Sequence, residues 1–284
     1  MRRRRRYNRA GNHFTAASVI CVLFFCANVF AQRNKPATQA ELDEITARGR
    51  ALYEYDAAAR HSTDAVMALK PAAGSFNMHV GKKTDKGWTL AYGKLSDKRD
   101  KYLIVYEAVQ GASIKEFKVT KFDQPKPDTG FYLNAARALE IVTLDDKPPV
   151  IPASRPYNIA VLPAPNDEFY VYVLPAQIKT GVFPLGSDSR YRISKDGRKI
   201  LEKRAMHKAI IEYSTPPNTA KVESGYHTAI LDEIPEDSDV FHVLARTPSV
   251  PEWVITKTYV YRITPDGGIK YIMTVEAFKK VGKQ

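Results

Sequence analysis

The residues best suited to chemistry lie between Gly225 and Arg246, in the stretch GYHTAILDEIPEDSDVFHVLAR. This stretch holds His227 and His242 with five carboxylates between them, and imidazole and carboxylate groups are the usual protein ligands of zinc-like cations. We predict two antiparallel strands, 225–231 and 240–246, because an alternating apolar pattern is typical of strands. Pairing Leu231 with Ser238 sets His227 directly opposite His242, at a Cβ separation of about 5 Å. Asp239 then completes a candidate metal site.

Two interpretations of these histidines stay open. A slip of one residue in the register would place the two rings on different faces of the sheet, and they would then serve packing while the acids form a solvated loop. The sequence contains no H-E-x-x-H motif and no calcium-loop order of acids, and Pro235 interrupts the acidic run. A nucleophile elbow and a phosphate-binding loop are also missing from the sequence. We therefore expect a non-enzymatic binding protein, with a metal-dependent hydrolase using His227 and His242 as the alternative.

A second polar feature is cationic and lies just before the histidines. Two predicted strands, 189–194 and 199–213, flank an Asp-Gly turn and carry Arg190 and Arg192 on one face and Lys199 and Lys203 on one face of the next. Such a surface could bind an anionic envelope polymer or lipid head groups through electrostatic attraction. The alternative is an ordinary solvated sheet face.

The first 31 residues predict export. Five consecutive arginines, Arg2 to Arg6, precede an apolar run that ends in Val29-Phe30-Ala31, which is the pattern of a signal peptide. We expect cleavage between Ala31 and Gln32, leaving 284 − 31 = 253 residues in a periplasmic or secreted protein; an uncleaved membrane anchor is the alternative. Removing six arginines lowers the net charge from +12 to +6, and both cysteines of the chain leave with the segment. Nucleic acid is therefore not an expected partner.

A long helix opens the exported part, after a polar tether at 32–37. Thr38 and Glu41 have the spacing of a capping box, and apolar residues recur every seven positions up to Pro71. The spacing predicts a helix over 39–69 with one buried face, and Gly49 is a possible break in it.

The rest of the chain alternates in strand fashion. We predict a region 38–147 that combines the long helix, a hairpin at 88–95 and 101–109, a third strand at 115–122 and a short helix at 131–142. A proline-rich stretch, 145–156, separates it from a β-rich region 155–284, in which 253–263 is expected to be one strand. The fold class is α+β, with a long N-terminal helix packed on mostly antiparallel sheet, and the two regions form either two domains or one.

Overall fold

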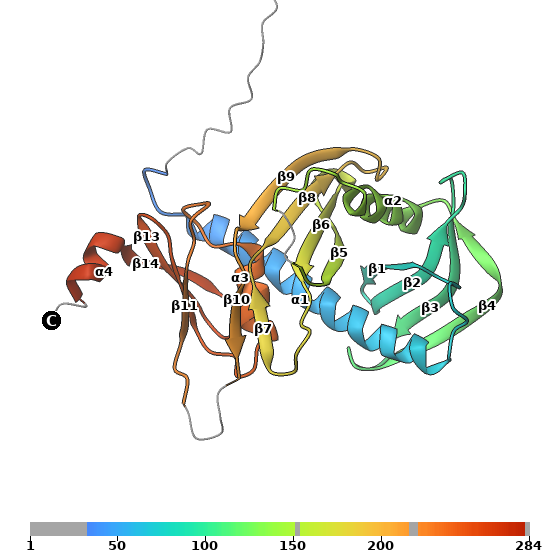
Figure 1. Cartoon of the computed structure of the whole chain (residues 1–284), viewed down its shortest axis with the longest axis horizontal. Coiled ribbons are helices and arrows are strands. Elements are labelled where there is room, and N and C mark those ends of the chain that lie inside the picture. The colour runs from blue at the N-terminus through green and yellow to red at the C-terminus, as the bar shows by residue number, and fades with distance from the viewer. Residues whose placement is uncertain (1–32, 151–153, 216–220, 282–284) are drawn as a thin grey trace, which may run out of the picture. The chain divides into compact units, whose positions relative to one another are not determined.

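The computed structural model describes residues 33–150, 154–215 and 221–281. The fold is α+β, as predicted, and the described residues form one compact unit (Figure 1). The predicted signal peptide and its cleavage site lie outside the described residues. Within those residues, no helix combines the length and apolar character needed to cross a membrane.

Helix α1 (Gln39–Ala68) is the longest element of the described chain and confirms the helix prediction. The Thr38 hydroxyl accepts the Glu41 backbone N–H, and the Glu41 carboxylate accepts the Thr38 backbone N–H, so the capping box is formed. Leu69, the last residue of the predicted helix, is 51% exposed because it lies beyond the last turn. Gly49 does not break the helix; it lets α1 approach a second helix closely, since a Cβ there would lie 2.5 Å from the Cβ of Val240.

The first sheet is antiparallel and follows chain order. It consists of β1 (Met78–Thr84), β2 (Gly87–Leu95), β3 (Tyr102–Gln110) and β4 (Phe117–Asp128). Strand β4 corrects our expectation that regular structure ends at Phe122, because it continues through Pro125 and Pro127. β4 is an edge strand, so the missing proline N–H groups leave no unpaired position in the ladder.

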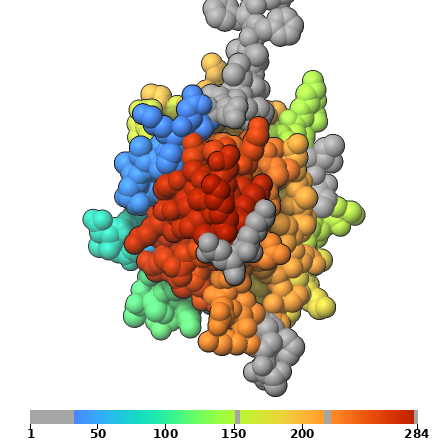
Figure 2. All heavy atoms as spheres, turned by 90° about the vertical axis from the view of Figure 1, so that its left-hand side faces the viewer, coloured from blue at the N-terminus to red at the C-terminus, as the bar shows by residue number. Residues whose placement is uncertain are grey.

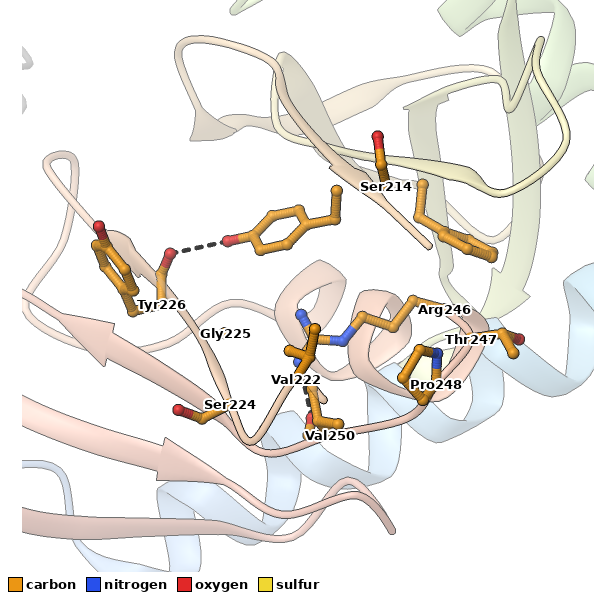
Figure 3. A pocket seen from close by; sticks show the side chains of 11 residues that line it. Ser214, Val222, Ser224, Gly225, Tyr226, Arg246, Thr247, Pro248 and Val250 are labelled. Carbon is orange, nitrogen blue, oxygen red and sulfur yellow. Dashed lines mark hydrogen bonds between the residues drawn. The ribbon is translucent and has the colours of Figure 1, made fainter. Parts of the chain in front are cut away.

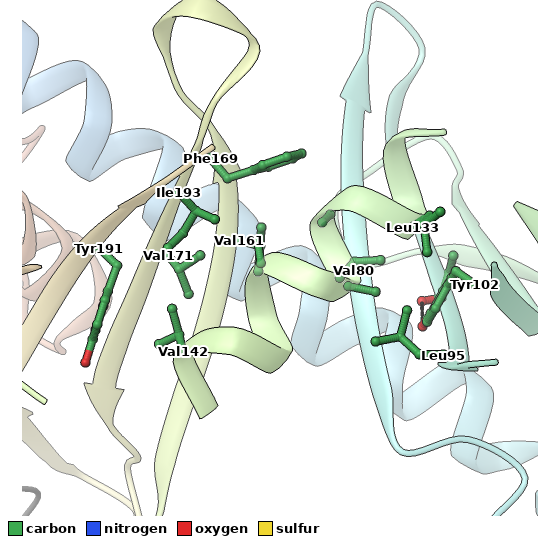
Figure 4. Close-up of a cluster of buried hydrophobic side chains, with 14 of the residues drawn as sticks. Val80, Leu95, Tyr102, Leu133, Val142, Val161, Phe169, Val171, Tyr191 and Ile193 are labelled. Carbon is green, nitrogen blue, oxygen red and sulfur yellow. Dashed lines mark hydrogen bonds between the residues drawn. The ribbon is translucent and has the colours of Figure 1, made fainter. Parts of the chain in front are cut away.

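Helix α2 (Phe131–Thr143) joins this sheet to the next one. The second sheet has the order β5 (Tyr157–Pro163), β6 (Phe169–Pro175), β8 (Asp188–Ile193) and β9 (Ile200–His207). Figure 4 shows α2 between the two sheets, with Leu133 facing Tyr102 and Val142 facing Val171. The main apolar core therefore lies around α2.

The C-terminal region differs most from the prediction. A short ribbon pairs β7 (Val182–Leu185) with β10 (Ile211–Ser214), and a third sheet has the order β11 (Gly225–Thr228), β12 (Glu252–Ile255), β13 (Tyr259–Ile263) and β14 (Ile269–Thr274). The expected single strand 253–263 is a hairpin, β12–β13, with a turn at 256–258. The expected strand 240–246 is helix α3 (Asp237–Ala245), and the chain continues after β14 into α4 (Val275–Val281).

Helix α1 contacts all three four-stranded sheets and packs against α3 (Figure 1). Its N-terminal end, drawn in blue in Figure 2, lies beside the red C-terminal strands. Hydrogen bonds fix this contact: the Thr46 hydroxyl donates to the Gly267 carbonyl, and the Ala37 N–H donates to the Tyr261 hydroxyl. α1 and α3 thus set where the third sheet lies relative to the second.

Candidate metal centre

Three potential metal ligands meet where the second sheet, the third sheet and α3 come together. They are His207 at the end of β9, His227 in β11 and Asp239 in the first turn of α3. Their ligand atoms all lie within 4.8 Å of one another, and Asp239 Oδ1 is 3.1 Å from the Nε2 atom of each histidine. All three residues are buried.

His207 is held by the strand beside it. Asp188 and His207 are register partners in the β8–β9 ladder, and their side chains meet, with Nδ1 2.9 Å from Asp188 Oδ1. An ionised carboxylate can only accept a hydrogen bond, so the Nδ1 atom carries the proton. When His207 is neutral, its Nε2 atom then carries a lone pair that can bind a cation.

His227 has an equivalent support. Its Nδ1 lies 3.0 Å from Glu252 Oε1, at the start of the neighbouring strand β12. Glu252 Oε1 also accepts the Tyr213 hydroxyl at 2.8 Å, and Oε2 accepts Arg246 Nη1 at 2.6 Å. Gly225 is required here because a Cβ at that position would lie 2.1 Å from Glu252 Oε2. Both histidines therefore have the carboxylate–imidazole arrangement that orients metal-ligating histidines in proteins.

Asp239 is oriented by the start of α3. Its Oδ2 atom accepts the Glu236 backbone N–H at 2.8 Å, which leaves Oδ1 for the histidines. The helix start is itself anchored, because the buried Asp237 carboxylate pairs with Arg48 of α1 and Arg190 of β8 and accepts the Tyr172 hydroxyl. The N-terminal end of a helix also favours negative charge. The contacts of the neighbouring Asp237 to α1, β8 and β6 therefore fix the position of Asp239.

Without a cation, the carboxylates raise the pKa values of the two imidazoles. Burial opposes this, but Asp188 and Asp239 raise the pKa of His207 well above its ordinary value. Burial likewise opposes the shift at His227, where Asp239 and then Glu252 raise the pKa to about 9. For Asp239, burial favours the neutral acid, but His227 and His207 lower the pKa below its ordinary range. Asp239 is thus ionised, and positive charge near its Oδ1 atom stabilises it.

Directions rather than distances favour a cation over hydrogen bonds at this position. Although Asp239 Oδ1 lies 3.1 Å from each Nε2, none of these three buried atoms makes an aligned hydrogen bond within the described part of the chain. A hydrogen bond needs the N–H to point at the acceptor, whereas ligands of one cation point at the cation and lie beside one another. For bonds of about 2.1 Å, neighbouring ligand atoms are about 3.0–3.4 Å apart. The two distances from Asp239 Oδ1 to the Nε2 atoms fall in this range.

His242 is not part of the cluster, which corrects the predicted pairing of His227 with His242. β11 pairs in parallel with β12, and His242 lies on α3, where its ring is 4.6 Å from that of Tyr213. Its Nε2 is 3.4 Å from Arg246 Nη1, and burial lowers its pKa to about 4. His227 and Asp239 are thus brought together as expected, but the second imidazole comes from His207.

Three of the four predicted anion-binding residues already have carboxylate partners. Arg190 pairs with Asp237; Arg192 pairs with Glu168 and Glu202; Lys203 pairs with Asp145. Lys199 is exposed, and its ammonium group has no ion-pair partner among the described residues. An anion would therefore have to compete with these carboxylates.

Sequence reasoning missed His207, Asp188 and Glu252. The available signal was the hairpin around the Asp-Gly turn at 196–197, because Asp188 and His207 stand at its two open ends. Searches against known proteins add nothing to the site, since no protein-family model, curated protein or solved structure matches the chain. The case for function therefore depends on the geometry above.

Proposed function

We propose that this is an exported, non-enzymatic binding protein that holds one divalent transition-metal cation at His207, His227 and Asp239. The observation that carries the proposal is the convergence of Nε2, Nε2 and Oδ1 from three separate elements, each with its own orienting partner. Two imidazoles and one carboxylate suit zinc and similar divalent transition metals, whereas magnesium and calcium prefer ligand sets made of oxygen atoms alone. We take Zn²⁺ as the reference cation.

The local charges support a divalent ion. The carboxylates at the site are Asp239 and the two that hold the histidines, Asp188 and Glu252, and the cation that touches them is Arg246. With neutral imidazoles the sum is −3 + 1 = −2. A buried net charge of this size is costly unless it is compensated; without a cation, two protons on the imidazoles compensate it, and a divalent cation that replaces these two protons compensates it equally.

The surroundings favour a binding role over a catalytic one. Two cavities lie nearby, one beside β11 and one between α2 and the second sheet, and none of the three ligands lines either of them. The cation would instead connect β9 of the second sheet with β11 of the third sheet and with α3. In this role it stabilises the junction between the two sheets.

Metal analysis with single substitutions tests the proposal. The protein is loaded with Zn²⁺, dialysed and measured by mass spectrometry for bound metal; we expect one equivalent per chain. His207→Ala and His227→Ala should each abolish stoichiometric binding. His242→Ala is the matched control, because it removes an equally buried histidine outside the cluster, and it should keep the metal. Absence of bound metal, or loss of metal only in His242→Ala, would refute the proposal.

A metal-dependent hydrolase is the second candidate, and one observation favours it. Three protein ligands leave one position of a tetrahedral zinc ion for water, which is the arrangement of catalytic zinc sites. Hydrolysis of an activated ester by the zinc-loaded protein, lost in His207→Ala and kept in His242→Ala, would favour this candidate. Zinc binding without such activity would favour the binding role.

A further inference from the structure

The cavity beside β11 is separate from the metal cluster, but two of its lining residues, Tyr213 and Arg246, hydrogen-bond to Glu252, which orients His227. It lies between the β7–β10 ribbon on one side and β11 with the segment after α3 on the other, and has a volume of about 260 Å³. Figure 3 shows Ser214 across the cavity from Val222, Pro248 and Val250. The two sides of the cavity thus come from several separate segments of the sequence.

The lining is apolar and aromatic with hydroxyl groups around it. Phe183, Tyr213, Val222, Pro248 and Val250 provide the apolar surface. The hydroxyl groups belong to the exposed residues Ser214, Ser224 and Thr247. Such a lining, with a few polar groups that fix orientation, is typical of small-molecule sites.

Charge decides the class of ligand. Among the described residues that line the cavity, Arg246 is the one charged residue, and its guanidinium already pairs with Glu252 and donates to the carbonyls of Val250 and Pro251. A ligand carboxylate would have to displace Glu252, and a ligand cation would meet Arg246. We propose that the cavity binds a small uncharged aromatic molecule carrying a hydroxyl group, and that its binding is coupled to the metal through Glu252.

The coupling follows from one oxygen atom. Glu252 Oε1 accepts both the Tyr213 hydroxyl at 2.8 Å and the Nδ1–H of His227 at 3.0 Å. A metal on His227 fixes that ring, and so fixes Glu252 and the Tyr213 side of the cavity. A preorganised wall binds a ring more tightly because less freedom is lost on binding. The coupling rests on the proposed metal function, whereas the ligand class does not.

The ligand class can be tested by fluorine NMR with 4-fluorophenol as the probe, and with 4-fluorobenzoate and 4-fluorobenzylammonium as anionic and cationic comparators. We expect 4-fluorophenol to bind most tightly. Ser214→Trp should abolish binding because the indole fills the cavity from an exposed position, and Leu69→Trp, at an exposed position outside the cavity, is the control. Tighter binding of either charged probe, or unchanged binding by Ser214→Trp, would overturn the proposed ligand class.

The coupling can be tested by measuring the Kd of 4-fluorophenol with Zn²⁺ and with a chelator. We expect zinc to lower the Kd about fivefold, at the lower end of ordinary coupling between sites. Tyr213→Phe keeps the ring but removes one of the two bonds from the cavity lining to Glu252, leaving that of Arg246, and should bring the ratio closer to one; Tyr226→Phe, an exposed tyrosine at the same cavity, should keep it. If zinc binds and the ratio is one in the unmodified protein, the coupling is wrong and the metal site stands. If zinc does not bind, both the metal site and the coupling fail, while the ligand class is judged by the first test alone.

Discussion

Replacing Asp188 with asparagine should weaken zinc binding without removing a zinc ligand. Asp188 is 1% exposed, and its Oδ1 holds His207 Nδ1 at 2.9 Å. The asparagine amide would lack the charge that makes the imidazole a strong ligand, and loss of such an orienting partner raises metal Kd about 10–100-fold. The zinc ion itself would keep all three ligands.

The size of the effect on stability follows from mass action. At a free zinc concentration of 100 times the Kd of the unmodified protein, zinc stabilises the fold by about 2.7 kcal/mol. A Kd raised 10–100-fold reduces this to about 1.4–0.4 kcal/mol at the same zinc concentration. At about 2–4 °C per kcal/mol for a chain of this size, the zinc-dependent gain in Tm should fall from about 5–11 °C to about 1–6 °C.

The assay is thermal unfolding of each variant with Zn²⁺ and with a chelator. The difference within one variant cancels any general loss of stability caused by the substitution. Asp145→Asn is the matched control, since Asp145, like Asp188, has a poorly exposed carboxylate. Asp145 accepts the Tyr191 hydroxyl and does not contact the histidines. Our reasoning is refuted if Asp188→Asn keeps the full zinc-dependent gain, or if Asp145→Asn loses it.

Three further predictions concern the rest of the chain. Gly49→Ala should destabilise the protein by about 1–3 kcal/mol in chemical denaturation, because the new Cβ meets Val240, whereas alanine at a solvent-facing glycine of a helix would stabilise it. Glu41→Gln should lower stability near neutral pH, because hydrogen bonds from Arg33 and Thr38 lower the Glu41 pKa to about 2. This contribution is present above the ordinary pKa of 4.5 and is lost as pH falls towards 2, so equal differences at pH 7 and pH 2 would contradict it. Intact-mass measurement of exported protein should give a chain beginning at Gln32, and a mass that includes residues 1–31 would contradict cleavage.

Local patterns predicted the elements that depend on local interactions. The capping box of Thr38 and Glu41 marked the start of α1, and alternation marked the hairpin of β2 and β3. The start of α3 was also readable, since Pro235 precedes acidic residues and Val240, Val243 and Leu244 have helical spacing. We misread this segment as a strand because its apolar residues fit a short alternating run as well.

The second metal ligand depends on events that local patterns do not encode. From the pair Ile193 and Ile200, an unbroken antiparallel register would place Ala205 opposite Asp188, since 193 + 200 = 188 + 205. Two register shifts in the β8–β9 ladder bring His207 to that position instead. The meeting of His207 with His227 and Asp239 further requires two sheets to pack around α3. The Asp-Gly turn marks the hairpin, but neither the register shifts nor the packing of the two sheets has a signature in the residues themselves.

The contact between α1 and the third sheet has a consequence for the order of folding. The hydrogen bond from Thr46 to Gly267 spans 221 residues, so strands synthesised long after α1 complete the surroundings of this helix. Until they arrive, the buried positions Leu42 and Ile45 lack their partners Val254 and Tyr261. Closing so long a loop is slow, and an incomplete chain exposes apolar surface in the meantime. A chain that stops before β12 should therefore aggregate rather than form a smaller stable domain.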